Sequence, residues 1–180
     1  FAVTSSWDNS DDGNWTGGGD LPGAIEAEGL VLAYDGEARA VIVMDVPADA
    51  AASTRFGIER AALFFQRVEE KASGVKLPVV AAHAPEAAEA HGRVRVLIGG
   101  GALSQAVGAD PDSLEVEEFR IQTIDDNLLL YGRDSIGAGE NGLIFPWGGG
   151  SFFAVARFLD RQWGARYIWP GDLGLYVPKT

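Results

Sequence analysis

The sequence has no cysteine, only two histidines and few basic residues, and each shortage removes a class of function. Without cysteine the chain forms no disulfide, no thiolate zinc site and no cysteine nucleophile. Its 14 basic residues face 26 acidic ones, which gives a formal net charge of −12 at pH 7. Phosphate backbones and anionic bilayers repel such a chain, so we predict neither nucleic acid nor a membrane as a partner. No apolar run is long enough to span a bilayer.

What the sequence does contain is enough apolar material for one folded domain. Of its 180 residues 47% are hydrophobic, among them 9 Phe, 5 Trp and 4 Tyr, which is incompatible with a wholly disordered chain. Residues 1–27 differ from the rest because they are rich in Gly, Asp, Asn and Ser and show no apolar period. We predict an irregular N-terminal arm over 1–27 and a single domain over 28–180. Phe1 is interpreted as a processed or trimmed end.

Two segments have the apolar period of an amphipathic helix. The first is predicted over residues 53–72, and its apolar stripe consists of Ala61, Phe64, Phe65, Val68 and Ala72. Ser53 or Thr54 is the predicted cap of this helix, and Gly74 is the predicted left-handed residue after its end. The second helix is predicted over residues 151–163, where apolar residues recur at the same spacing.

Shorter apolar or alternating runs predict β-strands between these helices. They are residues 29–34, 40–44, 77–80, 93–98, 119–123, 128–131 and 166–169. Asp35-Gly36 and Asp125–Asn127 have the composition of hairpin turns. Two helices with one apolar stripe each suit one face of a sheet. We therefore predict an α+β fold with two layers (an α/β two-layer arrangement): a mixed twisted β-sheet with two main amphipathic helices packed on one face.

Four blocks of sequence, taken in order, resemble the pattern of one domain family. RFGIERAALFFQRVEEKASGVKLPVV at 55–80 is similar to the family's first helix and following strand, with its "TGxxLP" stretch at 73–78. RVLIGG at 95–100 resembles an "I-x-I-G" strand, and EEFRIQTIDDNLLLYGRD at 117–134 resembles a "GFxIxTxxNxLxxxGxD" hairpin. The stretch 152–179 is similar to the family's final helix and its exit. The family that these blocks resemble is the N-terminal domain of alpha-glucuronidases, which is related to the leading domain of beta-hexosaminidases.

This resemblance implies a function for the chain and indicates which part of the parent protein carries the catalytic residues. In such proteins the acid and base carboxylates come from a (β/α) barrel that follows this domain. The chain is then expected to be a non-catalytic accessory domain that packs on a following catalytic barrel of the same polypeptide. The parent protein is expected to be a glycoside hydrolase like the alpha-glucuronidases, extracytoplasmic or secreted and bacterial. Residues 135–150 depart from the family pattern as an insert.

Aromatic side chains in the last quarter of the chain are the candidate ligand-binding residues. Phe145 and Trp147 lie in the insert, and Tyr167 and Trp169 share one face of the last predicted strand. Exposed aromatic rings stack on sugars, so the alternative function is a stand-alone carbohydrate-binding module whose partner is a polysaccharide. In the competing interpretation, Tyr167 and Trp169 pack the C-terminal segment and Trp163 belongs to the core.

The N-terminal arm contains a candidate calcium site. Asp8, Ser10, Asp12 and Asn14 alternate as in the first half of a calcium-binding loop. Position twelve of that loop is Gly19 rather than glutamate, and no helices are predicted beside it. We predict no resident cofactor, with calcium as the alternative to a plain acidic arm.

The remaining polar motifs do not make a catalytic set. The adjacent carboxylate pairs Glu69/Glu70, Glu117/Glu118 and Asp125/Asp126 are interpreted as solvated surface or turn residues. His83 and His91 lack the spacing of a metal pair and are interpreted as loop residues. Gly99–Gly101 follows a predicted strand and precedes a short helix, and this arrangement resembles the glycine-rich turn of dinucleotide-binding proteins. Because no acidic residue ends the next strand, we interpret it as a plain strand-to-helix turn.

Overall fold

A six-stranded sheet forms the centre of the protein in the computed structural model, which describes residues 5–8, 30–88, 93–115, 118–134, 149–168 and 174–178. The strands are β1 (Ser5–Asp8), β4 (Ala40–Met44), β5 (Val79–Ala81), β6 (Val94–Ile98), β7 (Phe119–Ile124) and β8 (Asn127–Gly132). Their order is β1-β7-β8-β6-β4-β5. β5, β4, β6 and β8 run parallel, whereas β7 is antiparallel to β8 and β1 is antiparallel to β7.

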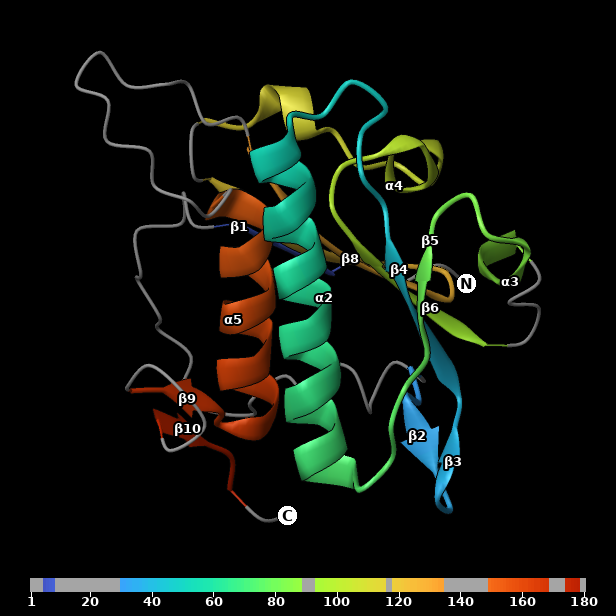
Figure 1. Ribbon diagram of the computed structural model, residues 1–180, viewed down its shortest axis with the longest axis vertical. Coiled ribbons are helices and arrows are strands. Elements are labelled where there is room, and N and C mark those ends of the chain that lie inside the picture. The colour runs from blue at the N-terminus through green and yellow to red at the C-terminus, as the bar shows by residue number, and fades with distance from the viewer. Residues whose placement is uncertain are drawn as a thin grey trace.

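Two long helices, α2 (Ala52–Ser73) and α5 (Gly149–Trp163), lie side by side on one face of this sheet (Figure 1). Their inner sides share an aromatic cluster in which Phe65 stacks on Phe158 and the Trp163 ring meets both edge-on. Such pairs stabilise a core beyond their buried area. The predicted α+β fold with two helices on one face is thus confirmed, and so is the interpretation of Trp163 as a core residue.

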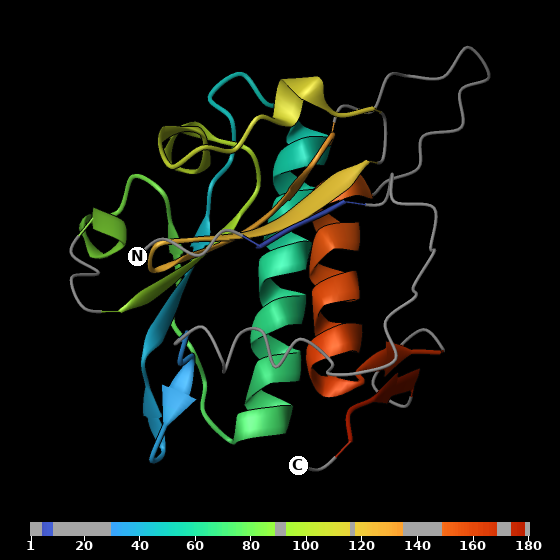
Figure 2. The same cartoon turned by 180° about the vertical axis from the view of Figure 1, so that it is seen from behind.

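The opposite face of the sheet is covered by short elements, α3 (Pro85–Ala88), α4 (Ala102–Ala106) and the 3₁₀ turn η1 (Pro111–Ser113). Figure 2 shows the sheet from this side, with α2 and α5 behind it. A second apolar cluster lies here and includes Val41, Val43, Leu97, Leu129 and Tyr131. β4 and β8 are therefore buried on both faces, which explains why their sequences are continuous apolar runs rather than alternating ones.

The boundaries of α2 agree with the predicted helix, but its cap does not. Gly74 ends the helix with φ = 77°, as predicted. At the other end the N-cap residue is Ala51, which offers no side-chain cap. Thr54 lies within the first turn of the helix, where its hydroxyl donates to the backbone oxygen of Asp134 at 3.0 Å. The prediction of a Ser53 or Thr54 cap was wrong because Thr54 is used for a tertiary contact.

Short two-stranded pieces complete the described part of the chain. β2 (Ala33–Tyr34) and β3 (Glu37–Ala38) are joined by Asp35 and Gly36, both with positive φ, which confirms this predicted turn. β9 (Arg166–Tyr167) pairs with β10 (Leu175–Tyr176). β1 differs from the expectation of an irregular arm, since it adds an antiparallel edge strand to β7. Among the described helices, none has both the length and the apolar character that a bilayer crossing requires.

Candidate functional site

The carboxyl ends of the parallel strands form the edge of this sheet where a ligand site is expected. Open α/β sheets bind ligands where neighbouring connections leave toward opposite faces. Here β4 continues into α2 on one face, and β6 continues into α4 on the other. The switch point between β4 and β6 is therefore bordered by Asp45 and by Gly99–Gly101. Asp134 follows β8 at the same edge.

Asp45 fills the switch point with its own carboxylate. Its side chain is 1% exposed, and its Oδ2 accepts the backbone N–H of Ser104 at 2.6 Å while its Oδ1 accepts that of Leu103 at 3.4 Å. The backbone oxygen of Asp45 also accepts the N–H of Gly101 at 2.9 Å. These N–H groups at the start of α4 are the groups that would bind a phosphate in a nucleotide site. An internal carboxylate already neutralises them.

The glycines of this turn are required by the close approach of Asp45 and Pro111. A Cβ on Gly101 would lie 2.4 Å from Asp45 Oδ1, and a Cβ on Gly100 would lie 2.8 Å from the Pro111 side chain. Gly99 adopts φ = 109°, a conformation that side chains rarely take. The glycines thus make room for protein atoms rather than for a pyrophosphate. This geometry agrees with the strand-to-helix turn expected for Gly99–Gly101.

Asp134 plays a similar role at the start of α5. One carboxylate oxygen accepts the backbone N–H of Ser151 at 2.8 Å, and the other accepts the Ser151 hydroxyl. Burial raises the pKa of Asp134 above its ordinary value, and the two bonds from Ser151 offset part of that rise. Because Thr54 binds its backbone oxygen, Asp134 ties β8, α2 and α5 together.

A pair of glycines beside Asp134 brings β8 and α5 into backbone contact. A Cβ on Gly132 would lie 2.4 Å from the backbone of Gly150, and a Cβ on Gly150 would lie 2.6 Å from the Arg133 nitrogen. The Ser151 hydroxyl lies 3.3 Å from the Gly132 nitrogen. This corner of the carboxyl edge is therefore packed as closely as the switch point, and its polar groups bind one another.

Glu69 is a buried carboxyl group that the sequence reasoning missed. It was expected on the solvated side of its helix, and that expectation was wrong: the residue is only 1% exposed. It lies four residues after Phe65 and seven after Ala62, so the helical period puts it on the buried side. Burial raises its pKa, a hydrogen bond with Ser73 lowers it by less, and its Oε2 has no hydrogen-bond partner. That spacing is the signal that could have found it.

The other carboxylate and histidine expectations agree with the described structure. Asp125 and Asp126 form the two-residue turn between β7 and β8, with φ = 51° at Asp125. Glu118 accepts the backbone N–H of Glu115 through its side chain, and His83 is exposed in a turn. Within the described segments, no three His, Asp or Glu side chains come together as metal ligands. Glu117 and His91 lie outside the described residues.

The predicted ligand-binding and calcium residues mostly fall outside the described part of the chain. This applies to Phe145, Trp147, Trp169, Ser10, Asp12 and Asn14. Tyr167 lies in β9 opposite Leu175, and Asp8 is the last residue of β1, opposite Arg120. The described residues therefore assemble neither predicted set, and both remain predictions.

No protein-family model matches the chain, and comparisons with curated proteins and with solved structures likewise find no match.

Proposed function

We propose that this chain is a non-catalytic accessory domain of a larger carbohydrate-active protein, and that it packs on a following catalytic barrel. The observation that carries the proposal is the carboxyl edge of the sheet. Asp45 and Asp134 are the buried carboxylates of this edge among the residues that the structure describes, and both are engaged as helix caps. A glycosidase needs two carboxylates that face a sugar, and capping carboxylates do not meet that need.

The resemblance to the alpha-glucuronidase N-terminal domain supports the same proposal. Two of the four similar blocks, at 117–134 and 152–179, are adjacent in space because Asp134 at the end of one caps the helix that carries the other. The block at 55–80 is joined to them through Thr54, the residue just before it. The described parts of these three blocks therefore pack together, as an accessory domain requires. An extracytoplasmic, bacterial parent protein belongs to this proposal.

A direct assay of the purified chain tests the proposal. We expect no release of reducing ends or uronic acids from glucuronoxylan, polygalacturonate or alginate fragments. An activity that survives two chromatographic steps and disappears in Glu70→Gln or Asp126→Asn would overturn the proposal, because it would make these surface carboxylates catalytic. Glu59→Gln is the matched control, since Glu59 is also exposed.

The reading frame that contains this chain offers a second test. Beyond Thr180 we expect a (β/α) barrel with paired carboxylates. That barrel, expressed as a separate polypeptide, should bind the chain in size-exclusion chromatography. A frame without such a barrel would contradict the proposal, whatever the assay of the isolated chain gives.

A further inference from the structure

Charge is distributed unevenly between the two long helices and the rest of the chain. α2 and α5 contain six of the 14 basic residues but only four of the 26 acidic ones. Their formal charge is therefore +2, while the remaining chain carries −14. One of the four acidic residues is the buried Glu69, so the positive excess at the helix surface is larger than this sum. An acidic protein thus has one basic helical layer.

The same layer exposes large apolar side chains. Phe56 and Leu63 of α2 are 45% and 46% exposed, and Phe153 of α5 is 43% exposed. Phe56 and Leu63 are seven residues apart, so they project from the same side of the helix. The stacked rings of Phe64 and Phe152, 5.5 Å apart, place the start of α5 beside the middle of α2. The three exposed residues therefore belong to neighbouring stretches of two packed helices.

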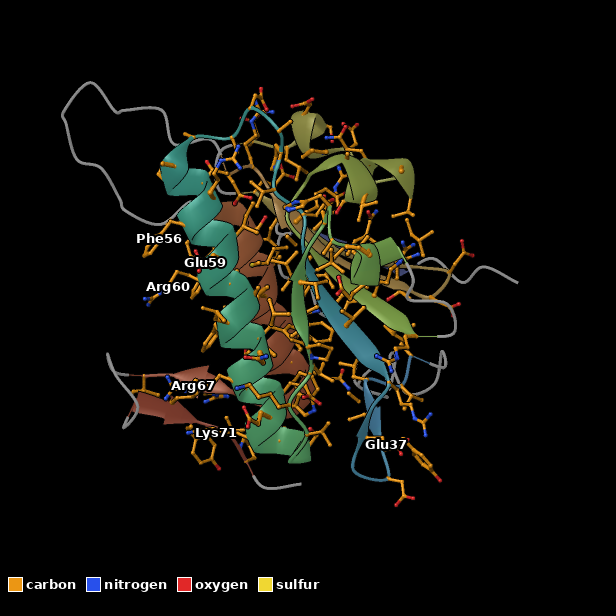
Figure 3. The ribbon with its side chains drawn as sticks, turned by 45° about the vertical axis from the view of Figure 1, so that its right-hand side comes forward. Glu37, Phe56, Glu59, Arg60, Arg67 and Lys71 are labelled. Carbon is orange, nitrogen blue, oxygen red and sulfur yellow. The ribbon has the colours of Figure 1, made fainter. Side chains whose placement is uncertain are left out.

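Arginine side chains lie among these apolar groups. Arg60 and Arg67 follow Phe56 and Leu63 by four residues each, which puts them on the same side of α2, at its edge toward α5. The exposed Glu59 and Glu70 lie at the other edge of this side, away from α5, so the positive charge is concentrated between the two helices. Figure 3 shows Phe56 and Arg60 projecting from α2 away from the sheet. The Arg60 guanidinium lies over the Phe56 ring, 5.7 Å from its centroid. We call Phe56, Arg60, Leu63, Arg67 and Phe153 the outer helix face.

We propose that the outer helix face is a docking surface for an acidic protein surface, one that presents apolar side chains among carboxylates. Clustered apolar side chains mark interaction sites, and aromatic residues and arginine are the types enriched at interfaces. Charge complementarity selects the partner. A second copy docked face to face would bring Arg60 and Arg67 against their own equivalents, and the −14 of the remaining chain opposes approach to an anionic bilayer.

This inference goes beyond the proposed function, because it does not depend on which reaction the parent protein carries out. A synthetic amphipathic peptide with leucine along one helix face and glutamate beside it is a suitable probe, and its lysine counterpart is the control. We expect fluorescence anisotropy to show that the wild-type chain binds the glutamate peptide, and that R60E/R67E weakens this binding about tenfold or more. Added salt should weaken it as well.

A matched double variant separates a local surface from a general charge effect. R39E/R93E changes the net charge by the same amount at two exposed positions next to the amino ends of β4 and β6. It should bind the glutamate peptide as the wild type does, provided that circular dichroism shows both double variants folded. Equal weakening by both variants, or no binding by the wild type, would overturn the proposal.

Two further measurements test whether the outer helix face instead binds an anionic bilayer or a second copy of the chain. Phosphatidylglycerol vesicles that bind the wild type but not R60E/R67E, without peptide binding, would assign the face to a bilayer and overturn the proposal. Self-association in sedimentation that R60E/R67E abolishes would assign it to a second copy and overturn it too. None of these readouts measures glycan cleavage, so this inference and the proposed function fail separately.

Discussion

The carboxyl edge of the sheet and the outer helix face differ in how their side chains are used. At the carboxyl edge, Asp45 and Asp134 are buried and bound to the N–H groups of helix starts. On the outer helix face, Phe56 and Leu63 are nearly half exposed beside arginine. The edge that often holds a ligand in α/β proteins is here filled by the protein itself. The helical layer, by contrast, keeps large apolar side chains exposed to solvent.

This difference predicts opposite responses to mutation. Substitutions at the carboxyl edge should destabilise the fold and leave intermolecular contacts unchanged, because each group there binds another part of the chain. Substitutions on the outer helix face should leave the fold stable and change binding. The predictions below test this contrast from the largest expected change in stability to the smallest.

Gly101→Ala should be the most disruptive change at the carboxyl edge. The new Cβ would lie 2.4 Å from Asp45 Oδ1 and 2.7 Å from the Asp45 backbone oxygen, so the cap of α4 must move. We expect urea denaturation to show a loss of about 3 kcal/mol in the free energy of unfolding. Gly36→Ala is the control, since its Cβ meets nothing within 4 Å and only its φ of 75° is strained. It should cost about 1 kcal/mol, and equal losses would contradict a close-packed edge.

Asp134→Ala should be the next largest change. It leaves the Ser151 N–H and hydroxyl without their acceptor and removes the cap of α5, for an expected loss of about 2–3 kcal/mol. Asp134→Asn retains an acceptor for the Ser151 N–H and should lose about 1 kcal/mol or less. Thermal denaturation compares the two variants. If the Asp134→Ala variant were as stable as the wild type and bound an anion that the wild type does not bind, the carboxyl edge would be a binding site, which contradicts the contrast.

Glu69→Gln should change stability in the opposite direction. Because the folded-state pKa of Glu69 is raised above the ordinary 4.5, the ionised form is penalised in the folded protein. Wild-type stability from this group is fully present below the unfolded pKa and is lost as the pH rises through the folded pKa. We therefore expect Glu69→Gln to be more stable than wild type at pH 7, by about 1 kcal/mol.

The pH dependence is the decisive readout for Glu69. The advantage of Glu69→Gln in urea denaturation should shrink as the pH is lowered from 7 toward 4, where the wild-type carboxyl is protonated. Glu70→Gln is the matched control, because Glu70 is the exposed neighbour on the same helix turn. An advantage that did not change with pH, or that Glu70→Gln shared, would contradict a buried Glu69 whose pKa is raised by burial.

Much of the fold could be predicted from sequence because its signals are local. The helical period of α2 and the Gly74 end depend on spacing and on backbone preference. The Asp35-Gly36 turn requires positive φ, which these residue types tolerate. These features need no knowledge of distant parts of the chain, and the structure agrees with them.

The candidate site was harder to predict because its polar groups bind residues far away in sequence. Asp45 binds the backbone of Ser104, and Thr54 binds Asp134, across 59 and 80 positions. No spacing rule connects such pairs, so Thr54 was assigned to a helix cap. Glu69 is different, since its place on the buried side was readable from the period. It was missed because carboxylates are rarely buried.

Leu63→Ala should have the smallest effect on stability and a clear effect on binding. Leu63 is 46% exposed and alanine is a better helix former, so we expect the free energy of unfolding to change by about 0.5 kcal/mol or less. Phe65→Ala, two residues away and fully buried, should cost about 3–5 kcal/mol. Affinity for the glutamate peptide should fall in Leu63→Ala, because an apolar contact at the centre of the face is lost. A Leu63→Ala variant that unfolded easily would place Leu63 in the core. If Leu63→Ala bound the glutamate peptide as tightly as the wild type does, the arginines alone would account for binding at the outer helix face, and its apolar side chains would not contribute.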